Sequence, residues 1–459
     1  MGGKRVNVDS KFQAKKRVKR YHADADDDRI SRLPDDILID ILSSLRLKEA
    51  ARTSVLSSRW VNLWKHNSRL DFDANSALCR IAQRYKETKL RIMERRTYVK
   101  WVNSVLRSHK GRATLKEFRI CFDLGPPAQR AITKWLKFAF ARRVERLELD
   151  LLEYGDFCTS SSEMYVFPQE LLTSRTLSFD FKDLKALCLK SVAVTDEAID
   201  FFLRNCPFLE QLIVHNAQKL SNLQVRGSLK HLEIYHCTRL KSIKVSNAPN
   251  LTSLTLTSLE GLLLENVPML VEFFVMGGHD NIYLKQLPRA LSCCISQLET
   301  LTLKLCSPTV RLKIIECPFP FPKLKKLVVD FFAKRDESLI ELASFLRTSP
   351  YLEEFVSIWD KPSRTKTQGK NNAAMPFPHL HLKVFKFLGY FGRSSDVELV
   401  RYILNNCVVL DKIIIDPHYQ AVFTHTPVEA DDLEAEQTTG IYAKQLEAEI
   451  PRRIEFVTL

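Results

Sequence analysis

A short phrase of apolar residues recurs along the chain and restricts what it can fold into. Each copy has one apolar residue, two variable positions, and then apolar side chains at every second position, as in Leu184, Leu187 and Leu189. Alternation with a period of two is typical of a strand that buries one face. One such strand cannot bury that face alone, so the phrase predicts strands stacked side by side around a shared core.

The copies start 19 to 40 residues apart, which is irregular but centred on the period of leucine-rich repeats. We therefore expect an α/β fold, a leucine-rich-repeat solenoid with parallel strands on its concave side and helices on its convex side. The copies are Leu115/Phe118/Ile120, Val144/Leu147/Leu149, Leu184/Leu187/Leu189, Leu209/Leu212/Val214, Leu229/Leu232/Ile234, Leu251/Leu254/Leu256, Leu270/Phe273/Val275, Leu298/Leu301/Leu303, Leu324/Leu327/Val329, Leu382/Phe385/Phe387, Leu410/Ile413/Ile415 and a weaker Leu352/Phe355 with Ser357 in third place.

Between the strands, the sequence predicts convex helices at Asp196 to Arg204, Glu337 to Arg347 and Asp396 to Asn405. The polar run Lys361 to Ala374 predicts a loop. Residues that alternate with the apolar set should face the concave side, where aromatic and Met side chains are typical of recognition sites. The candidate substrate-binding residues are His215, Tyr235, Phe274, Met276 and Lys304. Burial of these side chains under a loop is an equally open interpretation.

Ahead of the repeats, residues 29–75 have the pattern of three short helices. Ile37, Leu38, Ile41 and Leu42 recur on one helix face, and Pro34 with two following acids suits the start of that helix. A second helical stretch runs near Lys48 to Leu56, and Trp60 and Trp64 share one face of a third. So small a domain is of marginal stability, so we expect it to need a partner or a neighbour.

The formal net charge of +15 is local. Residues 1–20 carry +7 and residues 80–112 carry +9, so the remainder is at −1, which argues against a basic face along the whole array. Residues 1–28 predict a disordered tail whose basic cluster is either an import signal or an ordinary solvated segment. Residues 76–112 predict a basic helical linker, either a solvated helix face or a contact for an acidic partner.

The residues of the N-terminal domain resemble the F-box of plant F-box/leucine-rich-repeat proteins. The resemblance rests on Leu33-Pro34-Asp35-Asp36-Ile37-Leu38, on Thr53-Ser54-Val55-Leu56-Ser57-Ser58-Arg59-Trp60 and on Leu63-Trp64. Near the C-terminus, Leu382-Lys383, Gly389-Tyr390, Gly392 and Glu398-Leu399-Val400 are similar to the FBD domain of such proteins. The implied domains are the F-box at 29–75, repeats at 113–375, an FBD-like region at 376–418 and a C-terminal extension at 419–459.

The resemblance implies a substrate-recognition subunit of a Skp-cullin-F-box ubiquitin ligase. The F-box would bind a Skp-family adaptor, which links to a cullin and a RING protein, while the repeats recruit an unknown protein for ubiquitin transfer. It implies no cofactor, metal or catalytic residue. The implied adaptor-binding residues, which would either face the adaptor or hold the helices together, are Leu33, Pro34, Ile37, Leu38, Ile41, Leu42, Val55, Trp60 and Trp64.

Two other functions remain open from the sequence. One is an enzyme that carries ubiquitin as a thioester on one of the eleven cysteines, although no cysteine has an evident activating base. The other is an interaction scaffold outside a ligase, or an acidic-partner or nucleic-acid binder acting through residues 80–112, with nucleic acid the less favoured partner. Scattered cysteines and the lack of an apolar leader or spanning run predict a protein of the nucleus or cytoplasm that does not enter a membrane.

Overall fold

The computed structural model describes residues 30, 32–74, 88–111, 114–151, 164–173, 179–277, 282–306, 320–332, 339–359, 377–417, 442 and 444–459. The chain divides into two compact units, which we call the N-terminal unit (Met1–Trp64) and the repeat unit (Lys65–Leu459). This division differs from the expected boundary at residue 75. The tail at 1–28 and the loop at Lys361 to Ala374 lie outside the described residues.

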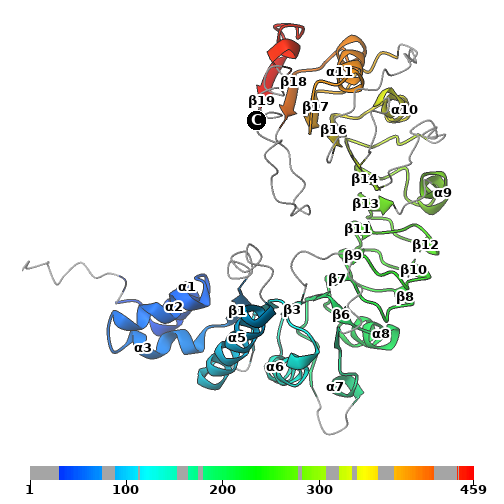
Figure 1. The fold of residues 1–459 in the computed structure, drawn as a ribbon. Coiled ribbons are helices and arrows are strands. Elements are labelled where there is room, and N and C mark those ends of the chain that lie inside the picture. The colour runs from blue at the N-terminus through cyan, green and yellow to red at the C-terminus, as the bar shows by residue number, and fades with distance from the viewer. Residues whose placement is uncertain are drawn as a thin grey trace, which may run out of the picture. The chain divides into compact units, whose positions relative to one another are not determined.

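The N-terminal unit consists of short helices in the order that the sequence predicts. These are α1 (Asp35–Ser43), α2 (Leu47–Arg52), the 3-10 turn η1 (Thr53–Val55) and α3 (Trp60–Leu63), after which η2 (Trp64–His66) begins (Figure 1). Leu38, Leu42, Ala50, Trp60 and Leu63 form its buried core. The three helices therefore share one small apolar centre.

An ion pair fastens the start of α3 to the start of α1. The Arg59 guanidinium lies 2.6 Å from Asp35 Oδ1, and it also donates a 2.5 Å hydrogen bond to the Leu33 carbonyl oxygen. These bonds join two segments of the motif that are far apart in the sequence. The Leu-Pro-Asp and Arg-Trp parts of the motif thus have a structural reason to occur together.

In the repeat unit, a parallel sheet of fourteen strands confirms all twelve copies of the apolar phrase. Its neighbours are in register throughout, for example Leu187 beside Leu212 and Leu301 beside Leu327. The phrase residues face the core, so a continuous apolar layer runs along the sheet. In spatial order the strands are β1 (Arg69–Asp73), β2 (Glu117–Cys121), β3 (Arg146–Asp150), β5 (Ala186–Lys190), β7 (Gln211–His215), β9 (His231–Tyr235), β11 (Ser253–Leu256), β13 (Glu272–Gly277), β14 (Thr300–Cys306), β15 (Lys326–Phe332), β16 (Glu354–Trp359), β17 (Val384–Leu388), β18 (Lys412–Asp416) and β19 (Glu455–Thr458).

Helices on the outer side of this sheet cover its apolar layer, while the strands line the inner side (Figure 1). Two predicted helices, at Asp196 to Arg204 and at Asp396 to Asn405, are confirmed as α8 (Asp196–Asn205) and α11 (Ser394–Asn406). In the third predicted helix, at Glu337 to Arg347, the described residues form η5 (Leu339–Leu342) and α10 (Ala343–Thr348). The outer elements are α5 (Thr88–Ser108), η3 (Pro126–Ala128), α6 (Gln129–Ala141), α7 (Glu170–Thr173), α8 (Asp196–Asn205), α9 (Ile282–Ala290), η5 (Leu339–Leu342), α10 (Ala343–Thr348) and α11 (Ser394–Asn406).

Short strands replace helices on the outer side where the repeats are shortest. β8 (Asn222–Val225), β10 (Ser242–Ser246) and β12 (Leu262–Glu265) form a second parallel sheet there. A separate pair, β4 (Tyr165–Val166) with β6 (Val192–Ala193), begins in the longest repeat, between the phrases at 144 and 184. The phrases beginning at 209, 229, 251 and 270 are only about 20 residues apart, the lower end of the leucine-rich-repeat range. That length leaves room for a strand but not for a helix of several turns.

The sheet begins and ends with strands that the sequence did not predict. β1 pairs with β2, and α5 follows it on the outer side, so the expected linker at 76–112 contributes a helix to the first repeat. The apolar phrase of β1 is hard to recognise in the sequence, because the buried Asn67 occupies the position where other copies have an apolar residue. At the other end β19, within the expected C-terminal extension, pairs with β18.

Candidate functional site

The N-terminal unit has apolar side chains in two environments, which the sequence could not separate. Leu38, Leu42 and Trp60 are buried in its core, and Leu33 and Trp64 pack against that core while partly buried. Ile37, Ile41 and Val55 are exposed, at 47%, 44% and 88% respectively, and Pro34 is exposed beside them in sequence. The nine candidate residues thus divide into a group that holds the helices together and a group that faces solvent.

Four further exposed apolar side chains of this unit, Ile30, Leu45, Leu56 and Val61, were not among those candidates. Leu45 follows Ile37 and Ile41 at the same four-residue spacing, while Leu56 and Val61 are exposed in the segments after α2. The spacing of Leu45 is a signal that could have placed it with the exposed group. We call Ile37, Ile41, Leu45, Val55 and Leu56 the apolar surface of the N-terminal unit. Exposed aliphatic side chains one turn apart on a helix, such as Ile37 and Ile41, are typical anchors of protein contacts.

The inner face of the repeat unit holds the five candidate substrate-binding residues. His215 Nε2 lies 2.8 Å from Glu233 Oε1, and the His215 ring lies 5.3 Å from the Tyr235 ring on the next strand. The hydrogen bond to His215 lowers the pKa of the Glu233 carboxyl. Tyr235 in turn contacts the His236 ring, and burial lowers the pKa of His236. His215 and Tyr235 are therefore brought together in a polar aromatic cluster.

The other three candidates lie two or more strands further along the sheet. Phe274 is half-buried on β13. Met276 is only 5% exposed, so the expectation that it presents an open apolar contact is wrong. Lys304, beside Met276 in register, forms a 2.9 Å ion pair with Asp330. Among the five candidates, Tyr235 and Phe274 are thus half-buried aromatic side chains, while Met276 is buried and Lys304 is paired.

The same inner face changes character from one end to the other. Near its start, Arg119 bridges Asp73 at 3.2 Å and Glu148 at 3.2 Å, so charged ladders cover β1 to β5. On the later strands Ile358, Leu388 and Ile414 occupy the equivalent alternating positions and are half-buried. Sequence reasoning missed these three residues, although the two-residue alternation that picked out Tyr235 also selects them.

The described thiols are poorly suited to nucleophilic chemistry. Burial raises the pKa of Cys237 to about 11 and those of Cys121, Cys206 and Cys407 to about 12. The exposed Cys293 also has a raised pKa, because it is partly desolvated. A thiolate is the reactive form, so these groups would be largely protonated and unreactive near neutral pH.

The described residues contain neither a candidate metal site nor a helix suited to a membrane. Within those ranges, no group of three or more His, Cys, Asp or Glu side chains is arranged to hold a metal ion. Nor does any described helix combine the length and apolarity needed to cross a membrane. His236 directly follows β9 and has a backbone φ of 53°, in the left-handed region.

Family models match two segments of the chain. The F-box domain model matches residues 30–72, and the model of the At1g61320/AtMIF1 LRR domain matches residues 176–456. The first segment contains the apolar surface of the N-terminal unit. The second contains strands β5 to β19 except for the last residues of β19.

Relatives from Arabidopsis thaliana match nearly the whole chain. The putative F-box/FBD/LRR-repeat protein At4g13965 is 30% identical over 85% of this chain and 90% of its own length. The F-box/FBD/LRR-repeat protein At4g26340 is 28% identical over 83% of this chain and 91% of its own length. The F-box/LRR-repeat protein At3g26922 is 31% identical over 62% of this chain and 95% of its own length. The F-box match precedes the leucine-rich-repeat match, and the first relative is aligned over most of both chains. The chain therefore belongs to the F-box/FBD/leucine-rich-repeat family of plant proteins.

Proposed function

We propose that this protein is the substrate-recognition subunit of a Skp-cullin-F-box ubiquitin ligase. F-box domains generally bind Skp-type adaptors, and through such an adaptor the chain would be linked to a cullin and a RING protein. The repeat unit would hold an unidentified protein near the ubiquitin-charged enzyme. Its contribution would be proximity, with the chemistry performed by other subunits.

The observation that carries this proposal is the apolar surface of the N-terminal unit. The core of the unit is formed by Leu38, Leu42 and Trp60 among others, and it does not include Ile37 or Ile41, which are exposed. Exposed aliphatic groups one helical turn apart are the anchors by which a helix packs into an apolar groove of a partner. Burying such a side chain stabilises a complex by roughly 1.5–3 kcal/mol.

For recruitment of the protein to be ubiquitinated, we propose the inner face around Tyr235 and Phe274. Both are half-buried aromatic side chains on a rigid sheet, so they can contribute contact area at low entropic cost. Ile358, Leu388 and Ile414 extend the apolar part of this face. A nuclear or cytoplasmic location, where ubiquitin ligases of this type would meet their targets, remains part of the proposal.

The test is affinity purification from proteasome-inhibited plant cells with three versions of the full chain. Ile37→Asp/Ile41→Asp should lose the adaptor and accumulate client proteins, because the clients are no longer ubiquitinated. Tyr235→Ala/Phe274→Ala should keep the adaptor and lose clients. The matched control Phe208→Asp/Met269→Asp changes two side chains that are exposed on the repeat unit and should behave as wild type. Equal adaptor recovery by wild type and Ile37→Asp/Ile41→Asp would refute the proposal.

A further inference from the structure

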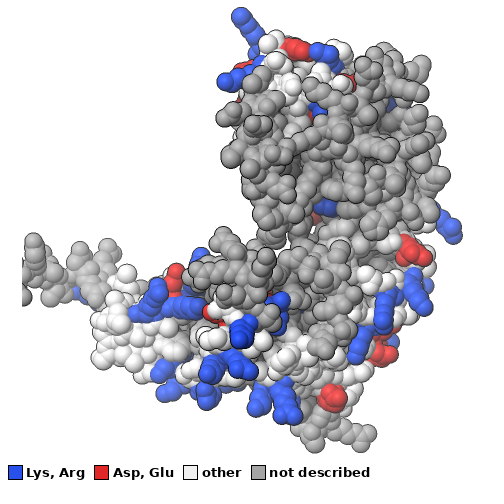
Figure 2. Space-filling model, in the orientation of Figure 1, with Lys and Arg blue, Asp and Glu red and all other residues white. Residues whose placement is uncertain are grey.

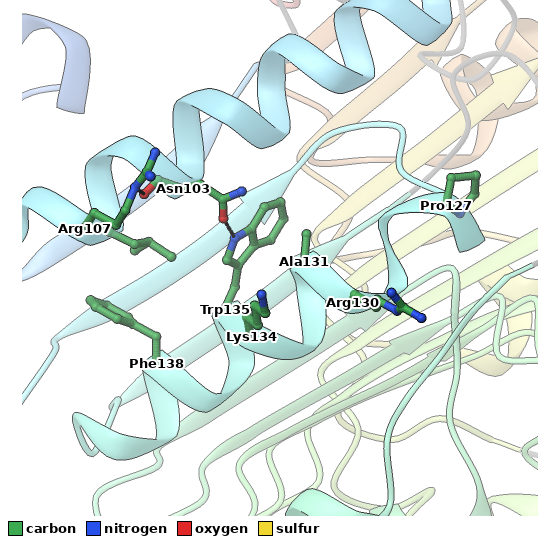
Figure 3. A pocket seen from close by; sticks show the side chains of 9 residues that line it. Asn103, Arg107, Pro127, Arg130, Ala131, Lys134, Trp135 and Phe138 are labelled. Atoms are coloured by element: carbon green, nitrogen blue, oxygen red, sulfur yellow. Dashed lines mark hydrogen bonds between the residues drawn. The ribbon is translucent and has the colours of Figure 1, made fainter.

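A groove in the repeat unit lies between helices α5 and α6, outside both segments that family models match. It has a volume of about 620 Å³, and Leu106, Ala131, Trp135 and Phe138 contribute apolar surface to it. Its edges carry Arg107 from α5 with Arg130 and Lys134 from α6 (Figure 3). We call this feature the α5–α6 groove.

Helix α5 uses its basic residues in two different ways. Arg91 and Arg95 turn inward and form ion pairs of 2.6 and 2.5 Å with the buried Asp123. Arg91 and Arg95 therefore do not belong to a solvated helix face, which was one of the two interpretations of this segment. Those two cations hold α5 against the segment after β2, so they are unavailable to a ligand.

The remaining basic residues of α5 form a separate row. Lys89, Arg96, Lys100 and Arg107 follow at intervals of seven, four and seven residues, which places them on one helix face, and all four are exposed. The row is about 27 Å long at 1.5 Å per residue. None of these four cations has an ion-pair partner among the described residues.

Helix α6 supplies a second row on the other edge of the α5–α6 groove. Arg130 and Lys134 are one turn apart and exposed, and neither forms an ion pair with any other described residue. The sequence of α6 contains no acidic residue, and that of α5 contains only Glu94. Figure 2 shows Lys and Arg side chains gathered over this part of the repeat unit. The local potential therefore favours an anionic ligand.

The aromatic residues of the groove are not free to stack on nucleic-acid bases. Trp135 is 1% exposed, and its Nε1 donates a 2.8 Å hydrogen bond to Asn103 Oδ1 (Figure 3). The Arg142 guanidinium carbon lies 3.6 Å above the Phe138 ring, so one face of that ring is covered. Single-stranded nucleic acid is held by such stacking together with a positively charged groove. A polypeptide with carboxylates and aliphatic side chains fits the groove better.

We propose that the α5–α6 groove binds an acidic segment of a partner protein. The carboxylates of that segment lie against the rows that contain Arg107 and Lys134, and its aliphatic side chains contact Leu106, Ala131 and Phe138. The groove is a docking surface additional to the apolar surface of the N-terminal unit and to the inner face. Its occupant is recognised by negative charge combined with aliphatic contacts at helical spacing.

Binding is measured by fluorescence anisotropy with the full chain and a labelled peptide in which Leu residues recur at helical spacing among Glu residues. We expect saturable binding to the wild type. Arg107→Glu/Lys134→Glu should weaken it by about tenfold or more, because both edges of the groove become repulsive. The matched control Lys219→Glu/Arg226→Glu makes the same charge change at exposed sites near β8 and should leave the affinity unchanged.

Ala131→Arg separates groove docking from simple charge attraction. The variant adds a positive charge but fills the groove, and arginine is as acceptable as most residues within a helix. Docking predicts weaker binding by Ala131→Arg, whereas charge attraction alone predicts tighter binding. Circular dichroism confirms that each variant remains folded.

Four outcomes would overturn the proposal. The first two concern the peptide: the wild type does not bind the Glu/Leu peptide, or it binds equally well a peptide with Ala in place of Leu. The third is unchanged or tighter binding of the Glu/Leu peptide by Ala131→Arg. The fourth is that the wild type binds a single-stranded oligothymidine more strongly than the peptide. The last result would assign the groove to nucleic acid instead. None of these readouts uses an adaptor, so they are independent of the proposed ligase role.

Discussion

Gly389 ends strand β17 with a backbone φ of +81°, and a side chain added there would collide with the Trp359 carbonyl group. Its N–H donates a 2.7 Å hydrogen bond to the Asp416 carbonyl oxygen of the next strand. Ser191 and Asn216 end β5 and β7 in the same left-handed conformation. The Gly-Tyr pair that resembles the FBD domain therefore has a backbone explanation at this corner of the solenoid.

Gly389→Ala should lower the free energy of unfolding by about 1–3 kcal/mol, because it combines an unfavourable φ with a steric clash. Gly227→Ala is the matched control, since Gly227 has φ of +97° but no atom within 4 Å of an added Cβ. Urea unfolding followed by circular dichroism gives both values. Equal losses in the two variants would show that the collision with Trp359 contributes nothing.

Two buried histidines are held in their neutral form. His379 Nδ1 accepts a 3.0 Å hydrogen bond from the Leu382 N–H, so its Nε2, 2.9 Å from the Ser349 carbonyl oxygen, is the donor. His109 has the same arrangement, with Nε2 3.0 Å from the Asn67 carbonyl oxygen. Burial lowers the pKa of each ring below its usual 6.5. Protonation would remove the acceptor and place a charge in the core.

These lowered pKa values predict that acid destabilises the repeat unit. Unfolded histidines take up protons near pH 6.5 while His109 and His379 do not, so the free energy of unfolding should fall as pH drops below about 6.5. His109→Gln/His379→Gln should reduce the slope of that decline. His231→Gln, at an exposed site, is the control. Identical slopes of urea midpoint against pH for the double variant and wild type would contradict the assignment.

At the scale of elements, the attachment of α5 depends on one carboxylate. Asp123 is 4% exposed and accepts hydrogen bonds from the side chains of Arg91 and Arg95. Tyr98, on the same helix, donates a 2.6 Å hydrogen bond to the Phe72 carbonyl oxygen of β1. The helix therefore contacts the first repeat through both polar and aromatic groups.

Asp123→Ala should destabilise the protein by about 2 kcal/mol, because charge-assisted hydrogen bonds contribute roughly 1.5–3 kcal/mol and two arginines lose their acceptor. Asp200→Ala is the matched control, since the Asp200–Arg204 pair is exposed and such pairs contribute at most about 1 kcal/mol. Thermal unfolding monitored by circular dichroism compares the two variants. A loss from Asp123→Ala no larger than that from Asp200→Ala would mean that Asp123 does not anchor α5.

The sequence predicts the strands and helices better than it predicts the contacts between residues that are far apart in the chain. Each copy of the apolar phrase became a strand, because burial on one face imposes a two-residue period. β1 was missed because Asn67 replaces an apolar residue. The Asn67 carbonyl oxygen is bonded to His109, which lies 42 residues away in the sequence, directly after α5. Pairing of Arg91 with Asp123 also spans 32 residues and leaves no local pattern. Burial of Met276, likewise, depends on neighbours that alternation cannot identify.

At the level of the whole molecule, the proposed binding functions are assigned to separate surfaces. The N-terminal unit has a core that is complete without Ile37 and Ile41, and the repeat unit has an inner face and an α5–α6 groove of different chemistry. From the motif alone, all nine candidate residues of the N-terminal unit were equally good candidates for adaptor binding. Their burial now divides them, which makes variants that remove binding while preserving the fold possible to design.

We expect a Skp-type adaptor to bind the exposed, rather than the buried, apolar residues of the N-terminal unit. Isothermal titration of a purified adaptor into the full chain measures this binding. Ile37→Asp/Ile41→Asp should weaken binding by about a hundredfold, as two interface anchors of about 1–2 kcal/mol each would give, while the circular dichroism spectrum stays unchanged. Phe208→Asp/Met269→Asp should bind as wild type does. Unchanged affinity of the Ile37→Asp/Ile41→Asp variant would contradict the account.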